Sequence, residues 1–193
     1  MLRKLYDFTM RLAAAPRAKT FLAGISFIES SLFPIPPDVM LIPMVLANRK
    51  EAWRIAFICS LFSVLGGVLG YFIGLYFFEF IGETIIDFYG YQSKFEKFSA
   101  SYDEWGGWIV AFFGLTPFPY KVITIASGAV KLNLAVFMIA SVLSRSARFF
   151  LVAWLLKTFG EPIQEFIEKY LGILTILFFV LLFGGFFILK YAF

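Results

Sequence analysis

The chain has 193 residues, of which 61% are hydrophobic, 21% aromatic and 16% charged, and its formal net charge is +4. Soluble domains are about half apolar and about a quarter charged, so this composition excludes an ordinary water-soluble domain and predicts one compact membrane domain. The chain has no histidine and a single cysteine, Cys59. The commonest general base, a His/Cys metal cluster and an intrachain disulfide are therefore not expected.

Residues 1–20 are the first predicted element. Basic side chains outnumber acidic ones there, and apolar residues recur about one helical turn apart, which is typical of an amphipathic interfacial helix. Three later segments have the length and apolarity of complete spans: residues 55–78, residues 132–156, which carry two arginines, and residues 171–189. A span needs about 20 residues. The last of the three follows a loop within the C-terminal segment 157–193.

Two further apolar segments, residues 21–47 and 105–130, are interrupted by proline. A proline costs about 3 kcal/mol inside a helix, and neither limb of a broken segment is expected to cross a core of about 30 Å. One interpretation is two re-entrant helical hairpins, and the other is two kinked ordinary helices. We favour hairpins, because unpaired backbone at membrane depth must be buried in protein or line a cavity. The prolines at the breaks are Pro34, Pro36, Pro37, Pro117 and Pro119.

Each interrupted segment precedes a complete span, which predicts an all-α polytopic membrane protein containing a repeat of hairpin plus helix, with an extra C-terminal transmembrane helix. Basic residues gather at the amino end and near Lys50, whereas the loop 79–104 is mainly acidic. The positive-inside rule then places the N-terminus, Lys50 and Lys157 in the cytoplasm and Lys94 outside. With this orientation the hairpins enter from opposite faces, and the repeat is inverted.

Charges within the apolar segments are the candidate site, because a charge at mid-membrane costs about 2.5–3.5 kcal/mol and usually pairs or lines a wet cavity. We predict that Asp38 and Lys121, at the two hairpin tips, face each other, and that Glu29 pairs with Arg145 or Arg148. The two arginines lie three residues apart on one helical face. They could hold a phosphate group of a lipid, although a structural pairing with Glu29, or snorkelling of Arg148, explains them without a ligand.

Glycines at four-residue intervals form a small-residue stripe in the first complete span, at Gly66, Gly70 and Gly74. Such stripes let two helix backbones approach closely. We therefore predict that this stripe packs against a hairpin, and we assign the same role to Gly128 in the second interrupted segment. A nucleotide-binding role is not expected, because no strand–turn–helix pattern surrounds the glycines.

The order of these features resembles the DedA family, whose eukaryotic relatives carry the SNARE-associated or VTT domain. The resemblance rests on Glu29 before a proline break with Asp38, the glycine stripe, and the segment 117–128 with its basic residue. It covers residues 21–156 and is greatest for the short YqaA-type branch. It implies a multi-pass protein of the bacterial inner membrane with two opposed re-entrant hairpins. It also implies translocation of phospholipid or undecaprenyl phosphate-like lipid.

By motif position, the resemblance implies roles for five charged residues. Glu29 and Asp38 match the membrane acids of the family, and Arg145 and Arg148 lie near its later arginine. Lys121 stands where many members have arginine, and a lysine lacks the bidentate geometry that arginine offers a phosphate. The tip also departs from the family, because it reads Pro-Pro-Asp where Pro-Gly-Asp is common.

These observations favour a lipid flippase or scramblase-like transporter. A proton-coupled transporter of a small ion or solute is the alternative, with Glu29 or Asp38 as proton carrier, because burial at mid-membrane raises the pKa of a carboxylate that no cation neutralises and lets it load and unload protons. A structural membrane-homeostasis protein is a further alternative, whereas an enzyme is not expected. The expected partners are membrane lipids, with protons and a second copy of the chain left open. No cofactor, metal or nucleic acid is expected.

Overall fold

A computed structural model describes residue 15 and residues 17–32, 36–116, 118–160 and 162. All regular elements in these residues are helical, which confirms the all-α class. In chain order they are α2 (Ala18–Glu29), α3 (Asp38–Ala47), the short 3-10 helix η1 (Arg49–Glu51), α4 (Ala52–Phe77), the π-helical turn η2 (Phe78–Gly82), α5 (Glu83–Tyr89), α6 (Gln92–Leu115), α7 (Tyr120–Ala129) and α8 (Leu134–Phe159).

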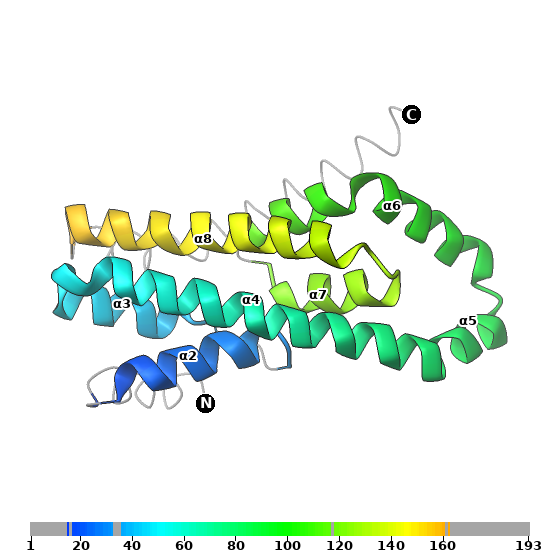
Figure 1. The fold of residues 1–193 in the computed structure, drawn as a ribbon, viewed down its shortest axis with the longest axis horizontal. Coiled ribbons are helices and arrows are strands. Elements are labelled where there is room, and N and C mark those ends of the chain that lie inside the picture. The colour runs from blue at the N-terminus through cyan, green and yellow to red at the C-terminus, as the bar shows by residue number, and fades with distance from the viewer. Residues whose placement is uncertain (1–14, 16, 33–35, 117, 161, 163–193) are drawn as a thin grey trace.

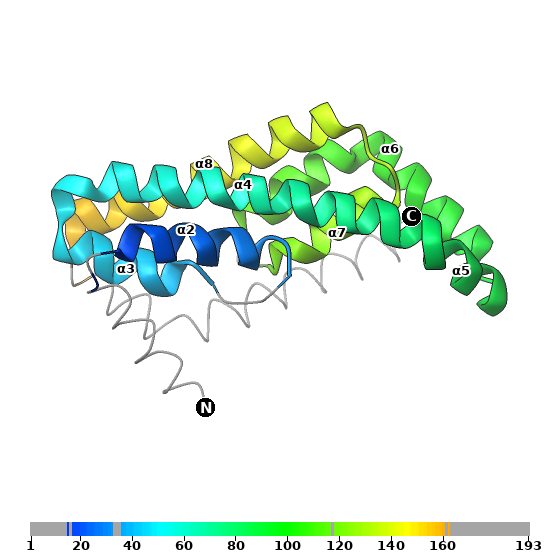
Figure 2. The same cartoon turned by 60° about the horizontal axis from the view of Figure 1, so that its bottom comes forward.

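The two longest helices, α4 and α8, run side by side along the molecule, as Figure 1 and Figure 2 show. The segments Arg49–Gly82 and Leu134–Phe159, of 34 and 26 residues, are long and apolar enough to cross a membrane. Both present large apolar side chains outward. On α4 these include Phe57, Leu61, Leu65 and Leu69, and on α8 Ile139, Leu143 and Leu151. This outward apolar surface suits a lipid environment.

The first interrupted segment forms a helical hairpin from α2 and α3. As helices, their 12 and 10 residues span about 18 Å and about 15 Å, less than the membrane core of about 30 Å. Lys19 Nζ, near the start of α2, lies 2.6 Å from a carboxylate oxygen of Glu51, just beyond α3. The hairpin therefore opens toward the N-terminal end of α4.

The second hairpin, from α6 and α7, opens toward the opposite end of α4. Lys131, two residues beyond α7, forms an ion pair of 3.0 Å with Glu79, two residues beyond α4. Figure 1 shows α2 and α3 at one end of the molecule and α6 and α7 toward the other. This arrangement supports an inverted repeat. The repeat itself stays a prediction, as does the insertion of each hairpin into a bilayer.

The prediction that residues 79–104 form a loop is wrong, because most of this segment is helical. It contains most of η2, all of α5 and the first half of α6, which has 24 residues. The first limb of the second hairpin is therefore about 36 Å long rather than short. Apolarity alone predicts that a helix stops where charged residues begin, but Glu, Lys and Gln are good helix formers.

Several predicted elements lie wholly or partly outside the described residues. These are the C-terminal helix 171–189, the two tip prolines Pro34 and Pro117, and most of the interfacial segment 1–20. The last three residues of that segment belong to α2. The two complete spans lie within a few residues of their predicted positions, since α4 begins at Ala52 and α8 ends at Phe159.

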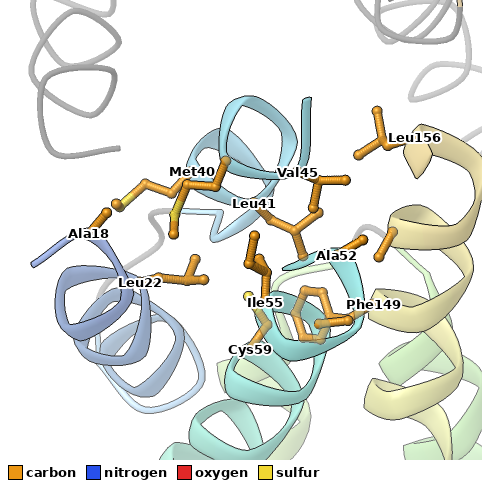
Figure 3. Close-up of a cluster of buried hydrophobic side chains, with 13 residues drawn as sticks. Ala18, Leu22, Met40, Leu41, Val45, Ala52, Ile55, Cys59, Phe149 and Leu156 are labelled. Atoms are coloured by element: carbon orange, nitrogen blue, oxygen red, sulfur yellow. The ribbon is translucent and has the colours of Figure 1, made fainter. Parts of the chain in front are cut away.

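Two apolar clusters stabilise the ends of the molecule. The first, drawn in Figure 3, joins α2 and α3 to the start of α4 and the end of α8; its larger members are Leu22, Met40, Leu41, Ile55, Phe149 and Leu156. The second joins α4, α6, α7 and α8; it includes Tyr71, Val110, Tyr120, Ile123 and Phe137. Most of the buried hydroxyl and charged side chains come from the middle of the fold, between these clusters.

The glycine stripe of α4 touches both hairpins. A Cβ atom on Gly66 would overlap the Phe27 carbonyl of α2, and one on Gly74 would overlap the Ile125 carbonyl of α7. Gly70, midway between them, lies against both hairpins, and Gly128 of α7 meets the backbone of α4 in the same way. Backbones this close leave no room for any larger residue.

Gly66→Ala tests this contact, with Gly24→Ala as the matched control. A Cβ at Gly24 has nothing within 4 Å, and alanine is favoured over glycine inside a helix by about 0.5–1 kcal/mol. Gly24→Ala should therefore keep or raise the melting temperature in detergent. Gly66→Ala should lower it, since overpacking typically costs about 1–3 kcal/mol. Equal melting temperatures would show that α2 and α4 do not approach this closely.

The predicted topology is tested by single-cysteine labelling after Cys59→Ser. Cysteines replacing Lys50 and Lys157 should react with an impermeant maleimide only from the cytoplasmic side, and one replacing Lys94 only from the outside. A protein solubilised in detergent, in which all three sites react, controls for accessibility. Labelling of positions 50 and 94 from one side would exclude the inverted repeat.

Candidate functional site

The charged residues of both hairpins meet near the middle of the molecule because of where the helices break. Glu29 is the last residue of α2 and Asp38 the first residue of α3. Lys121 is the second residue of α7, directly after its own proline break. Arg145 and Arg148 lie one turn apart on α8. Since proline is unfavourable inside a helix, both proline clusters end a helix here and bring chain ends and charges to the middle of the molecule.

Glu29 and Arg145 form the most deeply buried ion pair of the described residues. Arg145 Nη2 lies 3.0 Å from Glu29 Oε2, and the two side chains are 1% and 10% exposed. Arg145 Nε donates to Ser63 Oγ of α4 at 2.6 Å. Ser30 Oγ donates to Glu29 Oε2 at 2.9 Å and lies 2.7 Å from Ser63 Oγ. The ion pair and two serines thus link α2, α4 and α8.

Aromatic rings hold the guanidinium group of Arg145. Its Cζ lies 4.7 Å from the ring centroids of both Tyr120 and Phe149, within the range of cation–π attraction. The hydroxyl of Tyr120 donates to Ser141 Oγ, which fixes that ring. Arg145 Nη1 is buried and has no hydrogen-bond partner among the described residues. One edge of this guanidinium therefore has unused hydrogen-bonding capacity.

Arg148 connects the two breaks. Its Nη2 lies 2.6 Å from Asp38 Oδ2 at the start of α3, and its Nη1 donates to the Thr116 carbonyl at 2.6 Å, just beyond α6. The side chains of Arg148 and Asp38 are 17% and 21% exposed, so this pair is less buried than the first. The other carboxylate oxygen, Asp38 Oδ1, has no partner among the described residues.

The predicted pairing of Asp38 with Lys121 is wrong. Asp38 pairs with Arg148, and Lys121 Nζ donates to the Leu32 carbonyl at 3.3 Å. The physical reason is the guanidinium fork, which reaches a carboxylate and the free carbonyl at a helix end together, whereas an ammonium group is a compact point charge. Glu29 is predicted to pair with Arg145 or Arg148, and in the structure its partner is Arg145.

These charges surround a small cavity of about 80 Å³. Three cationic and two acidic side chains line it, so the lining carries a net charge of 3 − 2 = +1. Both carboxylates have arginine partners, and Lys121 has no carboxylate within 4 Å among the described residues. The lining residues are Glu29, Pro36, Pro37, Asp38, Phe118, Pro119, Lys121, Arg145 and Arg148. The cavity suits a small anionic group.

Sequence reasoning missed the uncharged members of the site. Ser30, Ser63 and Tyr120 contact the charged residues directly, but none of them belongs to a motif that sequence analysis singled out. A serine inside a long apolar span is a weak signal, because such hydroxyls often bond to a neighbouring helix. The Thr116 carbonyl gives no signal, since any residue has one. No group of three or more metal-ligating side chains occurs among the described residues.

Two proline-broken helical hairpins around a charged centre, packed on long apolar helices, define a class of helical membrane protein. Residues 35–158 match the VTT domain, and the chain belongs to this family, the DedA family. An uncharacterized protein of Haemophilus influenzae is 39% identical over 186 residues, covering 96% of each chain. One of Histophilus somni is 39% identical over 168 residues, covering 85% of this chain and 87% of its own. No solved structure matches significantly.

A double-mutant cycle tests which cation forms the ion pair with Asp38. Replacing Asp38 by Asn removes one charge of the pair, so Arg148→Gln should then cost less stability than it does in the native protein. The expected coupling energy is about 0.5–3 kcal/mol, measured by unfolding in detergent. The parallel cycle of Asp38→Asn with Lys121→Met should be nearly additive. A larger coupling energy between Asp38 and Lys121 than between Asp38 and Arg148 would support the prediction from sequence that Asp38 pairs with Lys121.

Proposed function

We propose that the chain is a flippase or scramblase-like transporter that moves lipid head groups across the bacterial inner membrane. The head groups would be those of phospholipid or polyprenyl phosphate lipids, and their tails would stay in the bilayer. One observation carries this proposal: a small cavity with one excess positive charge lies between the two helix breaks. Broken helices that meet around a polar centre are typical of membrane transport sites.

The chemistry of the cavity supports an anionic ligand. Lys121 brings an ammonium group whose partner is a neutral carbonyl, and Arg145 brings an unpartnered Nη1. Hydrogen bonds from such charged donors to phosphate oxygens are about twice as strong as neutral ones. The two arginine–carboxylate pairs cancel in charge, so Lys121 supplies the excess positive charge of the lining. An oxyanion would therefore find donors without first breaking either ion pair.

The surroundings of the cavity support a lipid rather than a fully soluble molecule. The outer faces of α4 and α8 are apolar along their length, so the tails of a bound lipid would meet hydrocarbon-compatible surface. The prolines Pro36, Pro37 and Pro119 line the cavity, and irregular backbone at membrane depth is tolerated where it borders a cavity. A head group in such a site would cross while its tails remain outside.

Proton coupling is a second candidate, for which Asp38 is the better-placed carboxylate. Its Oδ1 is buried and has no partner among the described residues, although the side chain as a whole is 21% exposed, whereas Glu29 is held by Arg145 and Ser30. A proton on Asp38 would leave the more buried Glu29–Arg145 pair and its two serines intact. Proton movement would accompany head-group transport or drive it, and it would use the same cavity.

Reconstitution in vesicles tests the proposal. The protein should move fluorescent phospholipid or polyprenyl phosphate lipid between leaflets faster than protein-free vesicles do, as dithionite quenching reports. Lys121→Gln, which removes the excess charge, should slow this about tenfold, equivalent to about 1.4 kcal/mol. Lys131→Gln is the matched control, since Lys131 pairs with Glu79 away from the cavity, and it should change little. No movement of any such lipid would rule the proposal out.

A further inference from the structure

We infer that Ser63 is a positioning residue: it holds Arg145 so that one guanidinium nitrogen is presented to an oxyanion in the cavity. The inference rests on the proposed function and deepens it. Ser63 lies in the middle of α4, is fully buried and does not line the cavity itself. It acts through Arg145, whose Nε donates to Ser63 Oγ at 2.6 Å.

The hydrogen bonds around Ser63 have one consistent direction. A carboxylate only accepts, so the hydroxyl hydrogen of Ser30 goes to Glu29 Oε2 at 2.9 Å. Ser30 Oγ must then accept in its 2.7 Å contact with Ser63 Oγ, and Ser63 donates. Ser63 in turn accepts from Arg145 Nε, while Arg145 Nη2 donates to Glu29. The contacts close into a ring that passes through α2, α4 and α8.

This ring leaves Arg145 with a single free nitrogen. Two of its three nitrogens are used within the ring, and Nη1 has no hydrogen-bond partner among the described residues although the side chain is only 1% exposed. The rings of Tyr120 and Phe149 each lie 4.7 Å from Cζ and restrict the plane of the group. A buried donor without an acceptor costs free energy, and an oxygen of a bound ligand removes that cost.

The ligand that fits is an oxyanion. The free Nη1 of Arg145 belongs to a residue lining the cavity, and Lys121 lines it too. A phosphate group accepts from both kinds of donor. The phosphate of a lipid head group and free inorganic phosphate share this chemistry. Without the hydroxyl of Ser63, Nε loses its acceptor, and the guanidinium can turn to satisfy Nε at the expense of the alignment of Nη1.

The test compares Ser63→Ala with Ser60→Ala. Ser60 is buried on the same helix, but its hydroxyl donates to the Ala56 carbonyl and not to the site. Both variants lose one buried hydroxyl, but only Ser63→Ala leaves the charged Nε of Arg145 without an acceptor, so its melting temperature should be the lower of the two and affinity is compared at a temperature at which both are folded. Only Ser63→Ala should raise the half-saturating density of phosphate-bearing lipid in reconstituted vesicles, by about tenfold as expected for a bond to a charged group. Its maximal rate should stay near that of Ser60→Ala, and Ser63→Thr, which keeps the hydroxyl, should restore affinity.

A second arm uses inorganic phosphate, which separates the two ligand sources. If the site takes free phosphate, millimolar phosphate should raise the melting temperature of the native protein and of Ser60→Ala, but not of Ser63→Ala. If it takes only the lipid, the effect should appear in the vesicle assay alone. In the Arg145→Lys background, Ser63→Ala should cause no further loss of affinity, because lysine has no Nε to position.

The outcomes distinguish this inference from the proposed function. If the native protein moves lipid and Ser63→Ala matches Ser60→Ala in affinity, Ser63 does not position Arg145, and the transport proposal stands. If the loss at Ser63 is the same with and without Arg145, the serine has a purely structural role. If the native protein neither moves lipid nor responds to phosphate, both the function and the inference are wrong.

Discussion

A guanidinium group almost fully removed from solvent is the constraint on which the rest of this fold depends. Arg145 is 1% exposed, and an unpaired charge at such depth is very costly. Its Nε and Nη2 are satisfied, and its plane is flanked by aromatic rings, only when Glu29, Ser63, Tyr120 and Phe149 are in place together. These groups come from α2, α4, α7 and α8. A single side chain thus ties the first hairpin to both long helices, and the apolar clusters on either side keep water away from it.

The buried contacts also depend on how closely the helix backbones approach. The hydroxyls of Ser30 and Ser63 are 2.7 Å apart, and both side chains are short. They meet because Gly66 and Gly70 let the end of α2 lie directly on α4. A larger residue in the stripe would separate the serines and open the ring at Arg145. Packing and polar chemistry in this molecule are therefore parts of one arrangement rather than independent features.

Much of this architecture could be read from the sequence, and the failures have identifiable physical causes. Long, mainly apolar runs locate α4 and, despite its two arginines, α8, because such runs suit lipid, and prolines locate the break within each hairpin. The partner of Asp38 could not be read in this way. It depends on the rotation of α8, which places Arg148 at the break, and on the reach of a guanidinium to the Thr116 carbonyl. Neither property has a signature in residue spacing.

The helices that follow α4 could not be read for a different reason. Their charged residues are good helix formers, but a search for apolar runs treats a charged segment as a loop.

The prolines at the breaks have a consequence for how the site can change. Pro36, Pro37 and Pro119 form a third of the nine residues around the cavity, and a proline has no backbone N–H to donate. In this part of the wall the main chain offers only acceptors, and the strong donors are the ends of three long side chains. Arg145 and Arg148 are each paired with a carboxylate, whereas Lys121 donates to a neutral carbonyl, so only the charge of Lys121 can change without unpairing an acid in the wall. The charge of this wall is therefore adjustable at one position, because the other cations that line the cavity also hold the helices together.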